Sequence, residues 1–441
     1  MQSISYAIQG GVPIHGKIVC RGAKNLATKA MIASLLCSDQ TILRGVPNIG
    51  DVEITRDLLL SIGIKIKWDR SLNIMYLDTS KINGHEVLLP DTKSNRLPIL
   101  LLSILLHRLG KAKVPIVGGD DIGKRKVDYH IEAIKKFGAD VYQKENSYIA
   151  ESTRRMKAVH IELPYPSVGA TETCLFLGVL AEGTSVVNNV ALEPEIIELI
   201  IMLRSMGAII SFSGNRRLVI QGVQELYGTN FSLMGDRIEA ASWASLACAS
   251  NGEIEISGIR PDLLENFLPY FYKIGGGFKF LKNNSILFFR KKDLVSTEVE
   301  TDVYPGFSTD LQQPFATILT QAKGISVIHE TLYEKRFDYL NALNKLGAKT
   351  KTVTSCLGSV KCRYRDQNHF HSALIYGPTK LSAISSPLSI PDLRAGLSYF
   401  IAAVLSKGET MLDVAEQIER GYGNLMDKLK DTNIKFKRIV N

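Results

Sequence analysis

The sequence lacks any apolar run long enough to cross a membrane. Its nearest candidate, Leu97 to Leu106, is interrupted by Ser103, whereas a membrane-spanning helix needs about 18 or more apolar residues. The first residues, MQSISYAIQG, have neither a charged start nor an apolar core followed by a cleavage site, so we expect no secretory signal. These absences argue against membrane proteins and exported proteins, and they favour a cytoplasmic location.

Cysteine is also scarce and scattered. The chain of 441 residues contains six cysteines, at Cys20, Cys37, Cys174, Cys248, Cys356 and Cys362. Most of them stand in apolar surroundings, so we expect reduced, buried thiols and no disulfide framework.

One group near the C-terminal end resembles zinc ligands, namely Cys356, Cys362, His369 and His371. Five residues separate its cysteines and one residue separates its histidines, a spacing that matches no common zinc finger. No glycine-rich dinucleotide fingerprint or P-loop follows a predicted strand. The sequence therefore predicts neither a metal site nor a cofactor.

Long basic runs are missing, although the net charge is +9. Nucleic-acid-binding proteins usually carry a basic stripe with interleaved aromatic residues, whereas the basic clusters here are as short as Lys124 to Lys126 and Arg290 to Lys292. We expect the positive charge to surround a small anionic substrate, and no nucleic acid to bind. The 45% hydrophobic and 22% charged content is that of a globular protein.

An internal repeat is the clearest positive feature. A glycine closes a helical pattern and precedes a strand at Gly63, Gly138, Gly207, Gly275 and Gly347, with successive gaps of 75, 69, 68 and 72 residues. A sixth, degraded copy is predicted to end near Asn433, since Asn can adopt the left-handed conformation that a helix end favours. Each copy has a first helix of small and apolar residues, a strand, an amphipathic second helix and a closing strand.

Six such units predict an α/β fold in two domains. A helix that is apolar on most faces is normally enclosed by other elements, so we expect the first helices inside and the strands outside. A doubly wound parallel sheet is the alternative, but that fold rarely buries a helix on all sides. The expected domains are residues 24–234, with units 1 to 3, and residues 1–23 plus 235–441, with units 4 to 6.

The starts of the first helices carry caps and charges. They lie at residues 22–25, 94–96, 167–171, 235–237, 308–310 and 391–394. A helix N-terminus favours anions because its N–H donors are unsatisfied and its dipole end is positive. Any single start is equally well explained as a cap beside a solvated charge, but six starts, three from each domain, would together suit a polyanion if they converge.

The chain resembles the UDP-N-acetylglucosamine 1-carboxyvinyltransferases, a family of enolpyruvyl transferases, in seven motifs that follow the family's order: CRGAKNLATKAM, PSVGATET, EPEIIEL, GDRIEAAS, ETLYEKRF, PDLRAG and IERGY. The resemblance runs from about Ile8 to Lys435. It implies a two-domain inside-out α/β barrel with three repeated units per domain. It also implies transfer of the enolpyruvyl group of phosphoenolpyruvate to the 3-hydroxyl of UDP-N-acetylglucosamine with release of phosphate, the first committed step of peptidoglycan synthesis.

The resemblance assigns roles at the reacting centre. Lys24 and Asn25 match residues that hold phosphoenolpyruvate, and Asp310 matches the carboxylate that contacts the 3-hydroxyl, which makes it the candidate base. Arginines that clamp phosphate and carboxylate are matched by Arg125, Arg394 and Arg420. A salt bridge of Arg420 with Glu419 is the structural alternative.

The resemblance also implies a nucleotide-sugar side of the site. Arg96 matches a residue on that side, and the helix start formed by Ser167, Val168 and Gly169 can receive the diphosphate. The stretch that matches the uridine-binding residues comprises Arg125, Lys126, Val127, Asp128, Tyr129 and Leu332.

One position departs from the family's usual pattern. The family's lid usually carries Gly-Gly-Cys with the Cys as proton donor, but the aligned position here is Asp120. An acid in this role needs a raised pKa; Asp121 and the substrate phosphate would raise the pKa of Asp120, whereas Lys124 and Arg125 would lower it. Either Asp120 or Asp121 can carry the proton. Fosfomycin alkylates the usual thiol, so an enzyme with a carboxylate there is expected to be insensitive.

Three alternative functions stay open at this stage. They are enolpyruvyl transfer to shikimate 3-phosphate, transfer to another nucleotide-sugar, and binding of a UDP-sugar without catalysis. The expected partners are phosphoenolpyruvate and UDP-N-acetylglucosamine, and the expected assembly is a monomer or a weak homo-oligomer.

Overall fold

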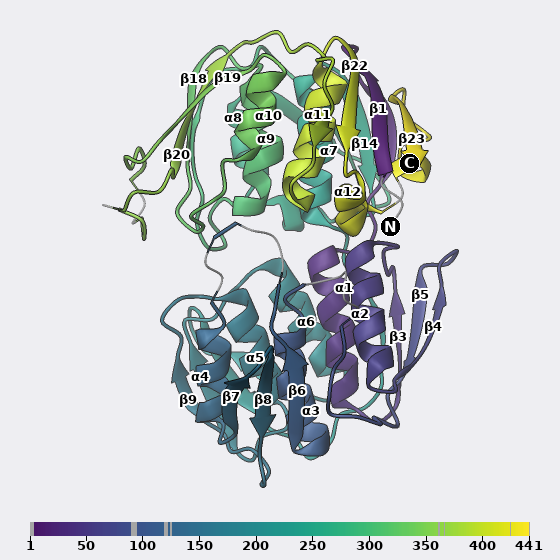
Figure 1. Ribbon diagram of the computed structural model, residues 1–441, viewed down its shortest axis with the longest axis vertical. Helices are drawn as coiled ribbons and strands as arrows, with labels where there is room; N and C mark the ends of the chain where they lie inside the picture. Colours follow the sequence, from purple (N-terminus) through teal and green to yellow (C-terminus); the bar gives the residue numbers. More distant parts are fainter. Residues whose placement is uncertain are drawn as a thin grey trace. The chain divides into compact units, whose positions relative to one another are not determined.

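The computed structural model describes residues 4–89, 95–118, 122–123, 126–359, 362–365, 367–423 and 425–440. The chain divides into two compact units (Figure 1). Unit 1 comprises Met1–Arg21, Asp120–Lys124 and Gly235–Asn441, and unit 2 comprises Gly22–Gly119 and Arg125–Met234. This division differs from the expected domains at residues 22–23 and 120–124. Within the described ranges, no helix combines the length and the apolar character that crossing a membrane requires.

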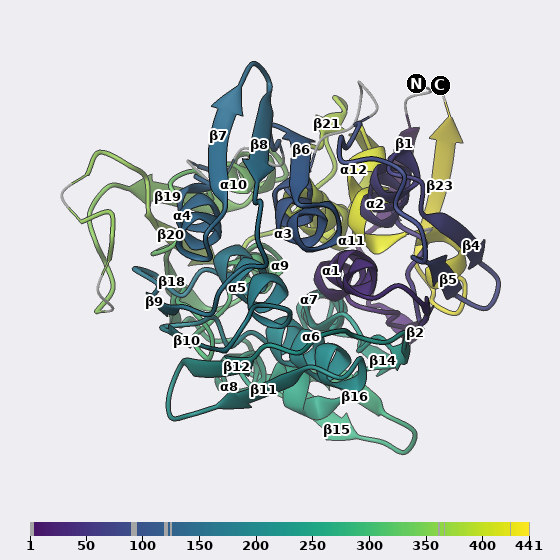
Figure 2. The ribbon, with the colours of Figure 1, turned by 90° about the horizontal axis from the view of Figure 1, so that it is seen from below.

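Unit 2 contains three small sheets. Their strand orders are β13-β3-β5-β4, β6-β8-β7 and β11-β12-β10-β9. The strands are β3 (Gln40–Arg44), β4 (Lys65–Asp69), β5 (Ile74–Asp78), β6 (Lys111–Pro115), β7 (Asp140–Lys144), β8 (Ser147–Glu151), β9 (His160–Glu162), β10 (Thr184–Asn188), β11 (Ile209–Phe212), β12 (Arg217–Gln221) and β13 (Asn230–Ser232). Figure 2 shows these strands on the outside of the unit's helices.

The helices of unit 2 are of two kinds. They are α1 (Lys24–Ala33), α2 (Gly50–Ser61), α3 (Pro98–Leu109), α4 (Asp128–Lys136), α5 (Val168–Gly178) and α6 (Pro194–Ser205), with a short 3₁₀ turn, η1 (Ser34–Leu36), after α1. The odd-numbered helices are nearly enclosed, and α3 is buried without interruption from Pro98 to Leu106 and packs against both α1 and α5. By contrast α4 buries only His130, Ala133 and Ile134, as an amphipathic helix should.

Unit 1 also contains three sheets. Their orders are β21-β22-β1-β23, β15-β16-β14-β2 and β17-β18-β20-β19. The strands are β1 (Ile4–Gly10), β2 (His15–Val19), β14 (Glu253–Ser257), β15 (Gly276–Phe280), β16 (Ser285–Arg290), β17 (Glu298–Glu300), β18 (Gly324–His329), β19 (Lys349–Val353), β20 (Ser372–Gly377), β21 (Leu388–Ser389), β22 (Gly408–Asp413) and β23 (Lys435–Val440). The N-terminal strands join this unit, since β1 is antiparallel to β22 and β23, and β2 is parallel to β14.

The core of unit 1 is again helical. Its helices are α7 (Arg237–Ala249), α8 (Leu268–Lys273), α9 (Gln312–Leu319), α10 (Tyr339–Lys345), α11 (Leu393–Leu405), α12 (Glu416–Tyr422) and α13 (Leu425–Lys428), with 3₁₀ turns η2 (Pro261–Leu264) and η3 (Thr309–Leu311). Every residue of α7 and of α9 is buried, and the two helices pack on each other and on α11. Small side chains such as Ala and Ser permit this enclosure, because they let neighbouring backbones approach closely.

The glycines that punctuate the repeat end helices as predicted. Each of these glycines follows an amphipathic helix and has a positive φ, between 89° and 111°. They are Gly63, Gly138, Gly207, Gly275 and Gly347. The expectation for Asn433 was wrong, because its φ is not positive and its side chain bonds the backbone of Pro13 and His15 instead. In the last copy, α12 ends with Gly423 as its cap residue, whose φ is 70°, and α13 then precedes the strand β23.

Candidate active site

Side chains cap four of the helix starts that the sequence singles out, through Ser167, Asp236, Ser308 and Asp392. The strongest cap is at α11, where the carboxylate of Asp392 accepts backbone hydrogen bonds from Arg394 at 2.8 Å and Ala395 at 3.0 Å. At α1, Ala23 provides no side-chain cap. The helix starts therefore differ in how their N–H groups are satisfied.

A group that we call the Asp310 cluster lies at one of these starts in unit 1. It consists of Asp310, on η3, with Arg336 and Arg394. Arg394 donates to Asp310 Oδ2 at 3.0 Å, and Arg336 donates to Oδ1. The arginine side chains are 3% and 5% exposed, whereas that of Asp310 is 27% exposed. One partly accessible carboxylate is thus fixed by two buried guanidinium groups.

Further side chains hold the arginines of this cluster in place. Arg394 Nη1 donates to the Tyr422 hydroxyl at 2.7 Å. Burial opposes the charge of Arg394, but Tyr422 and Asp310 nearby raise its pKa above the ordinary value. A guanidinium that stays charged while buried is suited to binding a carboxylate or a phosphate.

Glu330 is a buried carboxylate behind the same cluster. It accepts hydrogen bonds from Thr309 Oγ1 at 2.8 Å and from the Leu332 amide at 2.7 Å. Arg336 in turn donates to Thr309 Oγ1 at 3.3 Å. Burial raises the pKa of Glu330, and the charge of Arg336 opposes that rise. Glu330 therefore links the turn that carries Leu332 to the position of Arg336.

Arg420 lies in the last turn of α12, the helix that ends at Tyr422. Its guanidinium donates to Gln417 Oε1 at 3.0 Å. Glu419, the acid considered as its salt-bridge partner, instead accepts hydrogen bonds from Arg438 and Tyr6, both at 2.7 Å.

In unit 2 the first residue of α1 makes an ion pair that we call the Lys24 pair. Lys24 Nζ lies 2.7 Å from Asp51 Oδ2, on α2, and the two side chains are 16% and 8% exposed. Asn25 follows Lys24 and is half-buried. Asp51 thus helps to orient the ammonium of Lys24.

A second acid and base lie deeper on α1 and α5. Lys29 Nζ is 4.0 Å from Glu172 Oε1. Burial raises the pKa of Glu172 to about 7, while Lys29 opposes that rise, and burial lowers the pKa of Lys29. Desolvation disfavours the charged form of each group, so burial works against this ion pair.

The start of α5 packs closely against the ring of His130. Ser167 Oγ accepts from the Ala170 amide at 3.3 Å, and Val168 is the first helical residue. A Cβ added at Gly169 would lie 2.7 Å from the ring of His130, so only glycine fits there. Burial and the charge of Arg96 lower the pKa of His130 to about 3, which keeps that ring neutral.

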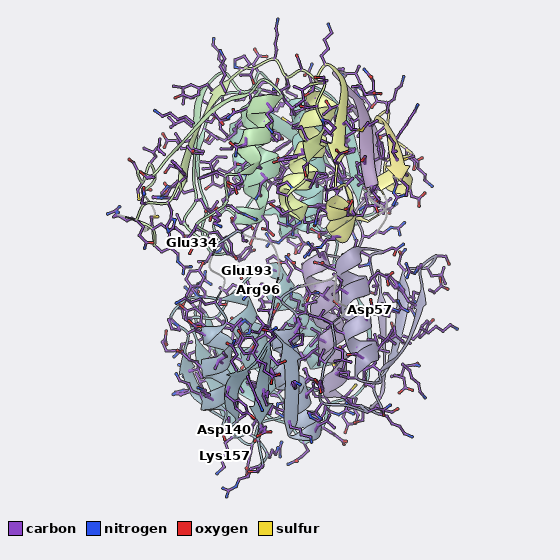
Figure 3. The ribbon with its side chains drawn as sticks, viewed as in Figure 1. Asp57, Arg96, Asp140, Lys157, Glu193 and Glu334 are labelled. Atoms are coloured by element: carbon purple, nitrogen blue, oxygen red, sulfur yellow. The ribbon has the colours of Figure 1, made fainter. Side chains whose placement is uncertain are left out.

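The other residues expected on the nucleotide-sugar side are mostly accessible. Arg96 lies just before α3 (Figure 3) and donates to the Lys126 carbonyl at 3.5 Å. Lys126 and Asp128 are exposed, Tyr129 is half-buried and Val127 is buried. In unit 1, the Leu332 carbonyl accepts a hydrogen bond from the Tyr364 hydroxyl at 2.7 Å.

Four residues named in the sequence analysis lie outside the described part of the chain: the lid residues Asp120 and Asp121, and Lys124 and Arg125. Sequence reasoning did not single out Asp51, Glu330, Arg336 and Tyr422, which complete the clusters. Three of these lie within or near motifs quoted above, since Glu330 and Arg336 belong to ETLYEKRF and Tyr422 ends IERGY. Their place in these motifs was the available signal, although it does not reveal which residues they contact.

Comparison with known proteins gives consistent results. The family model described as EPSP synthase (3-phosphoshikimate 1-carboxyvinyltransferase) matches residues 8–429. The UDP-N-acetylglucosamine 1-carboxyvinyltransferase of Protochlamydia amoebophila is 41% identical over 96% of this chain and 92% of its own length. The namesake from Thermotoga petrophila is 34% identical over 98% of each chain.

Solved structures show the same fold. The enolpyruvyl transferase NikO from Streptomyces tendae covers 100% of both chains with a TM-score of 0.85 at 20% identity. An EPSP synthase from Acinetobacter baumannii covers 100% of both chains with a TM-score of 0.68 at 14% identity. At these identities the likeness concerns the fold alone.

Proposed function

The chain belongs to the family of the UDP-N-acetylglucosamine 1-carboxyvinyltransferases, which are enolpyruvyl transferases, and from this premise we propose its reaction. It transfers the enolpyruvyl group of phosphoenolpyruvate to the 3-hydroxyl of UDP-N-acetylglucosamine and releases phosphate, in the first committed step of peptidoglycan synthesis. The observation that carries this proposal is the Asp310 carboxylate held between two buried guanidinium groups.

Addition followed by elimination accounts for the residue types present. Protonation of the vinyl carbon creates an oxocarbenium-like centre, and the sugar hydroxyl attacks that centre. The tetrahedral intermediate then loses phosphate and a proton from the methyl carbon, which restores the double bond. Asp310 accepts the hydroxyl proton as general base. Its fixed position, set by Arg336 and Arg394, favours a productive geometry.

Cationic groups stabilise the anions of the two substrates. Lys24 holds the phosphate of phosphoenolpyruvate, and Asn25 binds the hydroxyl and the intermediate. Arg394 and Arg420 clamp phosphate and carboxylate together with Arg125, since a guanidinium fork matches such groups in a bidentate manner. Charge that develops on phosphate as it leaves is thereby met by preorganised donors.

The nucleotide-sugar has its own set of contacts. Arg96 and the start of α5, with Ser167, Val168 and Gly169, receive the diphosphate. The uridine is contacted by the stretch Arg125, Lys126, Val127, Asp128 and Tyr129, and by Leu332. The exposure of Lys126 and Asp128 supports these roles.

Asp120 is the proposed proton donor to the vinyl carbon, in place of the cysteine usual in the family. A carboxylate is a far poorer nucleophile than a thiolate, so fosfomycin should not inactivate the enzyme. Incubating the purified protein with fosfomycin and phosphoenolpyruvate tests this directly. Asp120→Cys should become sensitive, and time-dependent inactivation of the unmodified protein would refute the assignment.

The main experiment compares acceptors. Phosphate release from phosphoenolpyruvate is measured with UDP-N-acetylglucosamine, with shikimate 3-phosphate, with other nucleotide-sugars and with no acceptor. Turnover is expected only with UDP-N-acetylglucosamine. Turnover with another acceptor alone would replace the proposed substrate, and tight binding of the UDP-sugar without any turnover would reveal a non-catalytic relative.

The repeat and the setting of the enzyme complete the proposal. Each unit, with three sheets and enclosed helices, is an inside-out α/β barrel of three repeated copies. The domains run over residues 24–234 and over residues 1–23 plus 235–441. The protein acts in the cytoplasm as a monomer or weak homo-oligomer, which sedimentation at several concentrations tests.

A further inference from the structure

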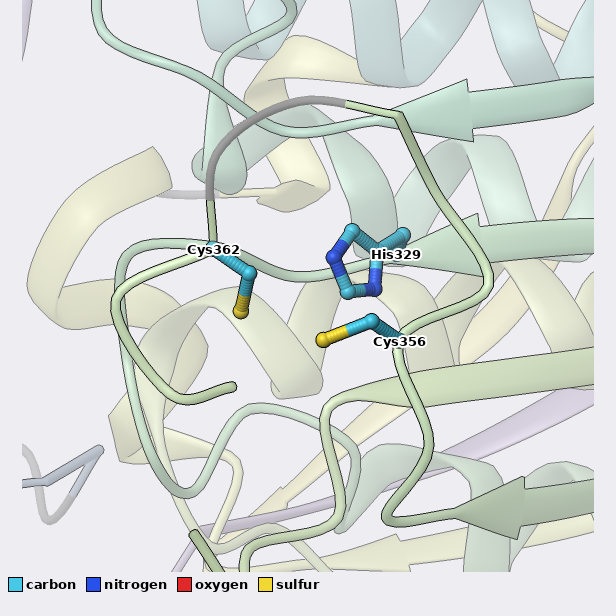
Figure 4. Close-up of side chains that lie close together, drawn as sticks. All are labelled: His329, Cys356 and Cys362. Atoms are coloured by element: carbon cyan, nitrogen blue, oxygen red, sulfur yellow. The ribbon is translucent and has the colours of Figure 1, made fainter. Parts of the chain in front are cut away.

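Cysteine and histidine side chains come together in unit 1, where the connection from β19 to β20 returns to β18. His329 ends β18, and its potential ligand atoms lie within 4.8 Å of the sulfurs of Cys356 and Cys362, which are equally close to each other. Figure 4 shows the imidazole and both Sγ atoms directed into one space. Cys356 Sγ is also 3.2 Å from His371 Nε2. Both histidines are fully buried.

Hydrogen bonds leave the Nε2 atoms of these histidines free of a proton. The Ser372 hydroxyl donates to the Ser355 carbonyl at 2.7 Å, so it can only accept from His329 Nδ1, 2.8 Å away. His371 Nδ1 faces the carbonyl of His369 at 2.7 Å and must likewise donate. A neutral imidazole that donates from Nδ1 presents a lone pair at Nε2. That lone pair points toward the sulfurs.

His329 Nε2 is an orphan atom. It is fully buried and has no hydrogen-bond partner among the residues that the structure describes. Leaving a buried polar atom unsatisfied costs about 1–3 kcal/mol, and native proteins rarely do so without reason. A cation bound at this nitrogen would satisfy it.

We propose that His329, Cys356, Cys362 and His371 bind a zinc ion. Thiolate and neutral imidazole are the ligands that zinc prefers, and a tetrahedral site places its ligand atoms about 3.3–3.8 Å apart. The ligand atoms of His329, Cys356 and Cys362 lie within 4.8 Å of one another, and His371 Nε2 lies 3.2 Å from Cys356 Sγ, so the four side chains would draw together around the ion. The bonds from Ser372 and the His369 carbonyl orient the rings, as partners of metal-bound histidines usually do. Binding releases the two thiol protons to solvent.

The ligand set explains why the spacing along the chain predicts no metal. Zinc fingers take their ligands from one short segment, whereas here His329 comes from a strand 27 residues before Cys356. The structure also selects His371 and not His369, whose ring is half-exposed. The motif of Cys356, Cys362, His369 and His371 does not contain His329, the further ligand of the proposed site.

The ion would fasten residues 354–371 to the end of β18. The loop already fits closely there, since a Cβ added at Gly358 would lie 2.5 Å from His329 Cδ2. Tyr364, from the same loop, holds the Leu332 carbonyl. With four protein ligands the ion has no open position, so its role is structural. It would stabilise the segment that begins at Leu332.

Metal content of the untagged full chain, purified from zinc-supplemented cells in reducing buffer, tests the site. About one zinc per chain is expected. His329→Ala, His371→Ala and Cys356→Ser should each reduce zinc to about a tenth or less, because a tetrahedral site lacks redundancy. His369→Ala is the matched control and should retain the metal.

Absorption spectra of the unmodified chain with cobalt test the proposal even if a variant fails to fold. Cobalt added to the metal-free unmodified chain should produce thiolate-to-metal charge transfer and the visible bands of tetrahedral coordination. Absence of both zinc and these bands would overturn the site, as would equal loss of zinc in His369→Ala and His329→Ala. A Cys356–Cys362 disulfide in the reduced preparation would also overturn it. None of these outcomes bears on enolpyruvyl transfer, which the acceptor assay decides.

Discussion

The Asp310 cluster and the Lys24 pair handle buried charge in opposite ways. Asp310 is a single acid whose two oxygens are taken by two different arginines, both almost inaccessible. Lys24 is a base paired with Asp51, and its side chain keeps some contact with solvent. The first cluster joins two arginines to one acid, with the acid Glu330 behind Arg336, whereas the second joins a lysine to Asp51.

This difference separates two kinds of functional group. Removing one partner of a buried ion pair strands the other charge and costs about 3–5 kcal/mol, so the Asp310 cluster is held rigidly. The Lys24 pair is also largely buried, but an incoming anion can replace Asp51 as the partner of Lys24. Rigid positioning suits a base, and exchangeable pairing suits a substrate-binding cation.

The largest effect is expected from removing the carboxylate of Asp310. Asp310→Ala should lower kcat for phosphate release about 10²–10⁴-fold, the usual contribution of a general base. Asp310→Asn keeps the shape and should lose nearly as much, because the amide cannot accept the proton. Asp293→Ala, at an exposed position of the same unit, is the control. Full activity in Asp310→Ala would remove the basis for the comparison.

The next effect concerns the pH dependence of stability in unit 2. The pKa of Glu172 is about 7 in the folded chain against an ordinary value of 4.5. Below pH 4.5 the acid is protonated in both states; between 4.5 and 7 only the unfolded chain loses the proton. The free energy of unfolding should therefore fall as pH rises through this window, by at most about 3 kcal/mol.

Replacing this acid by its amide should flatten that slope. Glu172→Gln is compared with Glu182→Gln, an exposed control, by urea unfolding at several pH values. The chain has two tryptophans, Trp68 in unit 2 and Trp243 in unit 1, so a Trp243→Phe background reports unit 2. An unchanged slope in Glu172→Gln would show that another group titrates in this range.

Substitutions of the two members of the Lys24 pair should lower kcat/KM for phosphoenolpyruvate by different factors. Lys24→Ala should lower kcat/KM for phosphoenolpyruvate about 10²-fold, as loss of a preorganised cation does. Asp51→Asn should lower it less than about tenfold, because substrate phosphate takes over the partner's place. Equal losses in the two variants would mean that Asp51 fixes Lys24 as firmly as the arginines fix Asp310.

The sequence predicted the elements better than the side-chain networks. Glycine at a helix end has a local cause, since only a left-handed residue continues the chain there, and all five glycines named above obey it. Asn433 failed because Asn has a second option, and its side chain satisfies backbone groups of Pro13 and His15.

Contacts between residues that are distant in the sequence could not be predicted. The resemblance identified Asp310 and Arg394, but Arg336 reaches Asp310 from another segment, and nothing local announces that contact. His329 and Cys356 illustrate the same limit. A motif within one segment can be read from spacing, whereas a site assembled from strands and loops depends on the tertiary fold.

The smallest expected effect compares two caps at helix starts. Asp392 accepts two backbone hydrogen bonds at 2.8 and 3.0 Å with a charge that favours the helix dipole, whereas Ser167 accepts one at 3.3 Å without a charge. Asp392→Ala should cost about 1–2 kcal/mol in the unfolding of unit 1, and Ser167→Ala about 0.5–1 kcal/mol in unit 2. Urea unfolding in Trp68→Phe and Trp243→Phe backgrounds, respectively, measures each. If the two costs are equal, the charge of Asp392 contributes little to capping at the start of α11. The rigidity of the Asp310 cluster would then rest on its arginines alone, and not on the charged cap that precedes Arg394.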